Sequence, residues 1–162
     1  MESENKNYVS EDGVLFEVNS DGYYNLIQYP NGNKTEHYKL PDKTVKLGLY
    51  TFYGTQHLRT ITINSKLSTV GSGVFIQTPK LEMIYVDSGN THFSSDDGVL
   101  MNYEKTILYE YPRGNTSSIY FIPGTVTSIA SQSFRGCSSE KTIFYSIYIE
   151  IFTRLFCFLY KC

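Results

Sequence analysis

The sequence predicts a solenoid of short parallel β-strands, in which each coil packs against the next. The segment Thr60–Ile63 reappears 23 positions later as Met83–Val86, with the same alternation of apolar side chains. A longer copy is offset by 82 positions and pairs residues 29–33 (Tyr-Pro-Asn-Gly-Asn) with residues 111–115 (Tyr-Pro-Arg-Gly-Asn). Self-similarity at a fixed period of this length is typical of repeat proteins, whose units bury their apolar faces only against their neighbours.

Five short strands are expected along this register. Alternation within each strand places two side chains inward and the one between them outward. The expected strands are residues 37–40, 60–63, 83–86, 119–122 and 142–145. Their inward pairs are Tyr38/Leu40, Ile61/Ile63, Ile84/Val86, Tyr120/Ile122 and Ile143/Tyr145. The outward residues form a column of Lys39, Thr62, Tyr85, Phe121 and Phe144, at successive separations of 23, 23, 36 and 23.

The other side of each coil is expected to hold turns or short 3-10 segments, because little chain remains between strands for a long helix. Pro41 and Pro123 follow their strands directly, where a missing N–H donor helps to end a strand. These segments also supply apolar side chains to the core. The expected core residues are Leu67, Val70 and Phe75 in one coil and Val126, Ile129 and Phe134 in another.

The single separation of 36 residues indicates an insertion in the solenoid. Two β-rich runs around a short polar turn, at residues 97–112, predict an inserted β-hairpin. Residues 12–30 show a matching pattern near the N-terminus. We therefore expect residues 1–145 to form one mostly β solenoid that carries two hairpins.

Residues 146–162 form a hydrophobic tail that allows three interpretations. As a degenerate last repeat, it places Ile149, Phe152 and Cys157 23 residues after Val126, Ile129 and Phe134. As a membrane helix, it would bury Glu150 and Arg154 at about 2–3 kcal/mol each, which disfavours membrane association. As an aberrant end, it would have no selected fold. The sequence favours the degenerate repeat and leaves the other two open.

Composition and charge exclude several classes of partner. The 162 residues contain 14 Lys and Arg against 16 Asp and Glu, so the formal net charge is −2. This balance predicts neither a nucleic-acid-binding surface nor strong attraction to anionic membranes. The first residues lack the basic start and apolar run of a secretory signal, so the sequence leaves the localisation unknown.

No catalytic or metal-binding set emerges from the sequence. The three histidines, His37, His57 and His92, are scattered, and the three cysteines (Cys137, Cys157, Cys162) have no CxxC spacing. The acidic turns at 11–13 (Glu-Asp-Gly) and 96–98 (Asp-Asp-Gly) lack the alternate-position spacing of a calcium loop, and their Asp-Gly pairs are better explained as turn residues. We expect no enzyme, no cofactor and no metal.

At residues 123–139 the order proline, valine, isoleucine, phenylalanine and cysteine resembles the repeat of BspA-like surface antigens, the Treponema-type leucine-rich repeat. Residues 90–100 resemble the hairpin insertion of the same family. The resemblance covers about residues 8 to 145. It implies a leucine-rich-repeat solenoid displayed on bacterial or protist surfaces and used for adhesion and protein binding.

Two functions remain as hypotheses. The first is a non-enzymatic binding module that presents the outward column to a protein of a host, a matrix or a neighbouring cell. It requires that neither the hairpins nor a packed terminus cover Phe121 and Phe144. The second is a structural or degenerate fragment that self-associates without a specific ligand.

Overall fold

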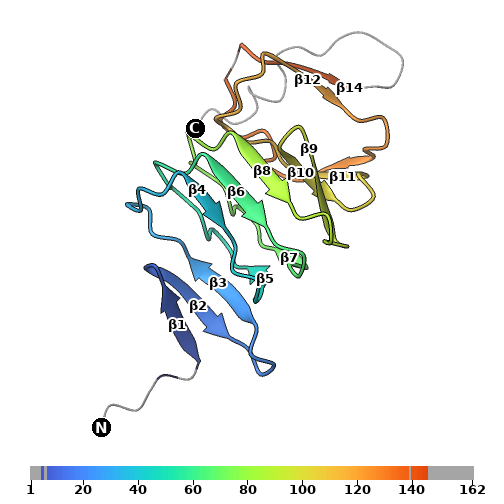
Figure 1. Cartoon of the computed structure of the whole chain (residues 1–162). Helices are drawn as coiled ribbons and strands as arrows, with labels where there is room; N and C mark the ends of the chain where they lie inside the picture. The colour runs from blue at the N-terminus through green and yellow to red at the C-terminus, as the bar shows by residue number, and fades with distance from the viewer. Residues whose placement is uncertain (1–4, 6, 139, 146–162) are drawn as a thin grey trace.

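The structure, a computed structural model, describes residues 5, 7–138 and 140–145. The regular secondary structure of these residues is β-strand, and the strands succeed one another from the N-terminal to the C-terminal end of the molecule (Figure 1). They are β1 (Tyr8–Glu11), β2 (Val14–Val18), β3 (Tyr24–Gln28), β4 (His37–Lys39), β5 (Thr44–Leu47), β6 (Thr60–Ile63), β7 (Thr69–Val70), β8 (Met83–Val86), β9 (Phe93–Asp96), β10 (Val99–Asn102), β11 (Ile107–Glu110), β12 (Ile119–Ile122), β13 (Ser128–Ile129) and β14 (Thr142–Tyr145).

The expected row of parallel strands is present and is divided into two sheets. Strands β4, β6 and β8 form one sheet, in which Tyr38, Ile61 and Ile84 are successive partners. Strands β12 and β14 form the other, in which Tyr120 is the partner of Ile143. The solenoid fold is thereby confirmed, with the alternation between buried and exposed side chains that the sequence predicts.

The expected alignment of all strands in one sheet is wrong at the long separation. β8 and β12 belong to different sheets, so Ile84 does not pair with Tyr120. The backbone N–H of Ile84 donates instead to the carbonyl of Gly98, at 2.9 Å, because the tip of the inserted hairpin lies beside β8. The inserted residues therefore separate two parts of the row.

A second row of parallel strands occupies the side of the coils where turns were expected. β3 pairs with β5 and β5 with β7, so that Leu26, Leu47 and Val70 are successive partners. In the second copy, β11 pairs with β13 and Leu108 with Ile129. β7 and β13 are two residues long, too short to show an alternating pattern in the sequence.

Each inserted hairpin is a three-stranded antiparallel meander. β1, β2 and β3 form the first meander, and β9, β10 and β11 form the second. The sequence analysis missed the opening strand of each. Asp12 and Gly13 have φ of 51° and 79°, and Asp97 and Gly98 have φ of 48° and 78°. Positive φ at both central residues is the type I′ turn of two-residue hairpins. Each Asp-Gly pair is therefore the tip of a hairpin, and not the start of one as the expected ranges 12–30 and 97–112 imply.

The buried side chains form two hydrophobic clusters along the solenoid. In the first, Phe52 stacks on Phe75 with ring centroids 5.6 Å apart, and in the second Tyr111 stacks on Phe134 at 5.3 Å. The two clusters meet in β10, where Leu100 belongs to the first and Val99 and Met101 to the second. Of the expected core residues, Leu67, Phe75, Val126 and Phe134 are buried, and Val70 and Ile129 are half-buried and pack against the clusters.

Two asparagines hold the coils in register. Each buried side chain makes four hydrogen bonds with the backbone, two as donor and two as acceptor. Asn64 bonds the carbonyls of Pro41 and Thr44 and the N–H groups of Lys66 and Leu67. Asn90 bonds the carbonyls of Asn64 and Leu67 and the N–H groups of His92 and Phe93. Full satisfaction of both amides explains how they can be buried at little energetic cost.

In the part of the chain that the structure describes, no helix is long and apolar enough to cross a bilayer. The predicted tail at 146–162, with its three interpretations, lies outside the described residues.

Candidate functional site

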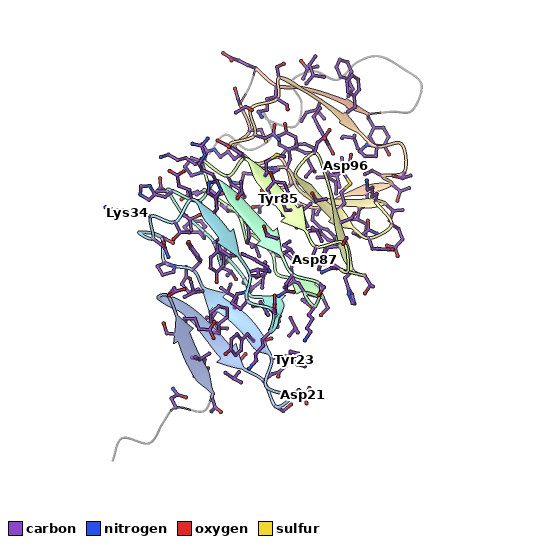
Figure 2. The ribbon with its side chains drawn as sticks, viewed as in Figure 1. Asp21, Tyr23, Lys34, Tyr85, Asp87 and Asp96 are labelled. Atoms are coloured by element: carbon purple, nitrogen blue, oxygen red, sulfur yellow. The ribbon has the colours of Figure 1, made fainter. Side chains whose placement is uncertain are left out.

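Lys39, Thr62 and Tyr85 lie side by side on the parallel sheet of β4, β6 and β8. Lys39 is the cross-strand partner of Thr62, and Thr62 is the partner of Tyr85. Lys39 is exposed, Thr62 is half-buried, and 45% of Tyr85 is exposed. Tyr85 is labelled on β8, at the end of this sheet, in Figure 2. We call these three residues the mixed patch.

Phe121 and Phe144 form the other part of the outward column. They are partners across β12 and β14, and their rings are stacked with centroids 5.0 Å apart and planes at 16°. Phe121 is 65% exposed and Phe144 39% exposed. The hairpins therefore leave both rings open to solvent. We call this pair the aromatic patch.

The structure does not join the two patches into one column. The mixed patch ends at β8 and the aromatic patch begins at β12, and the meander of β9 and β10 lies beside β8. A ligand that contacts both patches has to cross this interruption, whereas a smaller ligand contacts one patch alone.

The residues between the outward positions point into the core as the alternation requires. Ile61 and Ile84 are fully buried, and Tyr120 is 5% exposed. Burial raises the pKa of the Tyr120 phenol above its ordinary value, and the neighbouring Asp96 and Asp97 raise it further. Tyr120 therefore stays neutral at physiological pH and acts as a core residue.

The prediction that the Tyr145 side chain is buried in the core is wrong. Its side chain is 43% exposed, and its hydroxyl donates to the carbonyl oxygen of Val126. A tyrosine satisfies its polar tip by reaching the backbone of the preceding coil, which a purely apolar side chain at this position could not do.

Among residues 5, 7–138 and 140–145, the histidine and cysteine side chains lie apart from one another. His37 Nδ1 lies 2.9 Å from Thr60 Oγ1 across two strands, and His92 Nδ1 lies 3.3 Å from Thr91 Oγ1. Cys137 is buried within the second hydrophobic cluster. Among the described residues, His, Cys, Asp and Glu side chains form no group of three that could hold a metal ion.

Sequence reasoning missed the exposed side chains that border the aromatic patch. Ile119 lies on β12 and is 51% exposed, so it extends the apolar surface of Phe121 and Phe144. The signal was present in the sequence, because Ile119 has the same parity along the strand as Phe121.

A sequence model of the family described as BspA type leucine rich repeat region matches six copies in this chain, at residues 29–98 and 108–161. No curated protein matches this chain.

Three solved structures resemble the fold. The pneumococcal vaccine antigen PcpA is 27% identical over 65% of this chain, with a TM-score of 0.57. A leucine rich cell surface protein of Faecalibacterium prausnitzii A2-165 is 23% identical over 88%, with a TM-score of 0.62. A leucine-rich repeat protein of Eubacterium ventriosum is 16% identical over 85%, with a TM-score of 0.51. This chain spans 32%, 40% and 61% of those three proteins, respectively.

Proposed function

The chain belongs to the family of BspA-type leucine-rich repeats, and on that premise we propose that it is a non-enzymatic module that binds a protein at a cell surface. The observation that carries the proposal is the aromatic patch, in which two stacked phenylalanine rings stand open to solvent on a rigid pair of strands. Exposed aromatic rings that are already held in place lose little conformational entropy on binding, and they are common anchors of protein interfaces.

The mixed patch is proposed as the second contact area. Tyr85 offers an apolar ring with a hydrogen-bonding tip, and Lys39 offers a positive charge at the far edge of the same sheet. The partner is expected to be a protein of a host, a matrix or a neighbouring cell. The descriptions of two similar structures as a vaccine antigen and a cell surface protein support surface display.

The test replaces one exposed ring in each patch. Tyr85→Ser and Phe121→Ser should each weaken binding to extracellular-matrix and cell-surface proteins by tenfold or more, measured by surface plasmon resonance, because an interface anchor contributes about 2 kcal/mol or more. Stability should fall by about 1 kcal/mol at most, because both side chains are exposed and Phe121→Ser removes one cross-strand aromatic pair.

Tyr103→Ser and Leu49→Ser are matched controls, because these side chains are 53% and 66% exposed and lie outside the outward column. They should leave binding unchanged. Binding that survives both patch substitutions in a folded protein would remove the outward column from consideration.

Self-association is the second candidate. Within the described residues β14 pairs with β12 alone, and it carries the exposed rings of Phe144 and Tyr145. An exposed apolar strand at a sheet edge is a template for pairing with another chain. Size-exclusion chromatography with light scattering, comparing the full chain with residues 1–145, separates the candidates. Assembly of residues 1–145 would support pairing at β14. Assembly of the full chain alone would assign association to residues 146–162 instead, and a monomer in both cases would exclude self-association.

A further inference from the structure

The two hydrophobic clusters leave a pocket between them on the side of the second strand row. β7 ends the sheet of the first copy and β11 belongs to the sheet of the second, so the row is interrupted there. We call this boundary the seam. A cavity of about 290 Å³ opens at the seam between the turn at 71–76 and the turn at 130–132. None of the five outward-column residues lines it.

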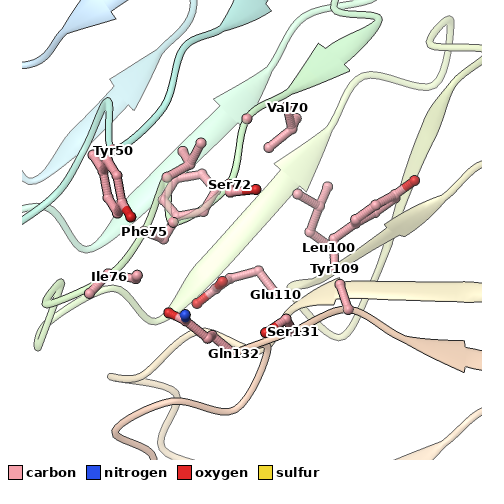
Figure 3. Close-up of a pocket in the computed structure, with 14 residues that line it drawn as sticks. Tyr50, Val70, Ser72, Phe75, Ile76, Leu100, Tyr109, Glu110, Ser131 and Gln132 are labelled. Atoms are coloured by element: carbon pink, nitrogen blue, oxygen red, sulfur yellow. The ribbon is translucent and has the colours of Figure 1, made fainter.

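One carboxylate reaches into this cavity. Glu110, at the end of β11, lies near the centre of the view in Figure 3, with Phe75 and Ser72 above it and Gln132 and Ser131 below it. Within the described residues, no hydrogen bond or ion pair satisfies the Glu110 carboxylate. Glu110 is half-buried, and this burial raises its pKa well above the ordinary value, because the ionised form loses part of its hydration without gaining a positive partner.

The remaining walls are neutral and partly aromatic. Tyr50, Phe75 and Tyr109 are among the lining residues, with the Tyr109 ring directed away from Glu110 in Figure 3 and packed on Phe93. Ser72, Ser131 and Gln132 bring polar groups. The two phenols are the other titratable groups in the lining, which includes no lysine, arginine or histidine. Arg135 lies outside the lining, and its Nη1 donates to Gln132 Oε1 at 3.1 Å.

This set of groups selects a small, flat cation. An anion would be repelled by Glu110, and a divalent metal ion would need several oxygen ligands of which at least two are commonly charged. The volume lies at the lower limit for drug-sized ligands, so it suits one side chain rather than a larger molecule. A guanidinium group pairs with a carboxylate through two parallel hydrogen bonds and stacks on aromatic rings, which matches Glu110 and the ring walls.

We propose that the seam pocket binds a guanidinium group, presented as an arginine side chain of a protein partner. The Glu110 carboxylate accepts the two N–H groups, the aromatic rings contact the flat faces, and the serine and glutamine oxygens accept from the remaining N–H groups. Binding favours the ionised carboxylate, so a proton leaves Glu110 as the cation enters. The affinity therefore rises with pH through the titration of Glu110 in the free protein.

The test uses the full chain and small probes followed by ¹H–¹⁵N NMR titration. N-acetylarginine amide should bind saturably with a Kd of about 1 mM or tighter, and should shift the amides of residues 71–76 and 130–132. N-acetylcitrulline amide has nearly the same shape without the charge and should bind roughly tenfold to a hundredfold more weakly. N-acetyllysine amide should also bind more weakly, because an ammonium group cannot form the paired hydrogen bonds.

Glu110→Gln should abolish the preference for arginine over citrulline, and Glu104→Gln is the matched control because Glu104 is exposed and outside the lining. Thermal unfolding shows whether Glu110→Gln folds. A raised pKa in the folded state means that the wild type loses stability as pH rises through that pKa. Glu110→Gln should therefore be as stable as the wild type at pH 4 and more stable at pH 8.

Equal binding of arginine and citrulline probes, or unchanged binding in Glu110→Gln, would overturn the proposal. Binding of agmatine without binding of the capped arginine residue would overturn the assignment to a protein partner. Tyr85→Ser and Phe121→Ser should leave the arginine probe bound, so failure of the outward column and failure of the seam pocket can be told apart.

Discussion

Left-handed backbone recurs at two fixed positions in the turn after the second strand row. The first position is occupied by Tyr50, Gly73 and Gln132, with φ of 55°, 68° and 69°. The second, four residues later, is occupied by Gly54, Gln77 and Gly136, with φ of 76°, 58° and 76°. Only glycine adopts these values without strain, so the repeat enforces the conformation even where the side chain opposes it.

Gln77→Gly should therefore stabilise the protein. A glutamine with left-handed backbone costs about 1–2 kcal/mol of strain, which glycine removes. The greater conformational freedom of glycine in the unfolded chain offsets about 0.5–1 kcal/mol of that gain. The expected result is a net increase of about 0.5–1 kcal/mol in the free energy of unfolding, measured by urea denaturation.

Gln56→Gly is the control, because Gln56 is an exposed residue without positive φ in the corresponding loop of the preceding coil, between β5 and β6. It should destabilise the protein slightly, since it also loses the hydrogen bond from its amide to the carbonyl of Gly54. If Gln77→Gly were as harmful as Gln56→Gly, the left-handed conformation at residue 77 would not be a source of strain.

At the scale of elements, the two meanders have the same type of turn at their tips but differ in what the tip contacts. A Cβ built on Gly98 would lie 2.6 Å from Met83 Sδ and 3.0 Å from Met83 Cα, because the second meander packs its tip on β8. A Cβ on Gly13 would meet only Pro30 Cγ, at 3.8 Å. The tip of the second meander therefore packs tightly against β8, whereas the tip of the first meander has space around it.

Gly98→Ala should cost more stability than Gly13→Ala, although both glycines have nearly the same φ. Gly13→Ala should lose about 1–2 kcal/mol for left-handed backbone alone. Gly98→Ala should lose that amount and about 1–3 kcal/mol more for overpacking against Met83. Thermal and urea unfolding of the two variants give the comparison, and equal losses would mean that the tip does not press on β8.

At the scale of the whole molecule, two cores joined through β10 predict two cooperative units. Repeat proteins are stabilised by contacts between neighbouring coils, so damage in one copy need not unfold the other. The seam weakens this coupling further, since neither strand row continues across it.

Phe134→Ala should open the second copy and leave the first protected. Removal of a buried phenylalanine costs about 3–5 kcal/mol, and Phe134 stacks on Tyr111 within the second cluster. Hydrogen exchange should show fast amides in β11 to β14 and slow amides in β3 to β8. Phe52→Ala is the matched change in the first cluster and should give the reverse pattern. Loss of protection in all strands at once, in either variant, would show a single cooperative unit.

The strand pairing and the pocket at the seam could not be predicted from the sequence. The 36-residue separation indicated an insertion, but a separation between repeats does not say which strands pair around it. Glu110 belongs to a strand-like run between two tyrosines and carries no sign of a pocket, because the groups that face it come from residues 72, 75, 131 and 132.

The Asp-Gly pairs show a different kind of limit. They were identified as turn residues, and two positive φ values in succession are their ordinary conformation in hairpins. The strands before them, β1 and β9, escaped notice since Tyr8–Glu11 and Phe93–Asp96 are short and polar. Their pairing depends on the hydrogen bonds of the neighbouring strand, which no pattern within four residues can reveal.

The sequence by itself determined the stride of the coils, the alternation along the strands and the outward position of Phe121 and Phe144, because periodicity is a local property that one chain displays. The tertiary structure alone decided that the outward column is two patches, that a second strand row exists, and that Glu110 faces a cavity. These features arise from contacts between coils on either side of an insertion, where distance along the chain no longer indicates proximity in space.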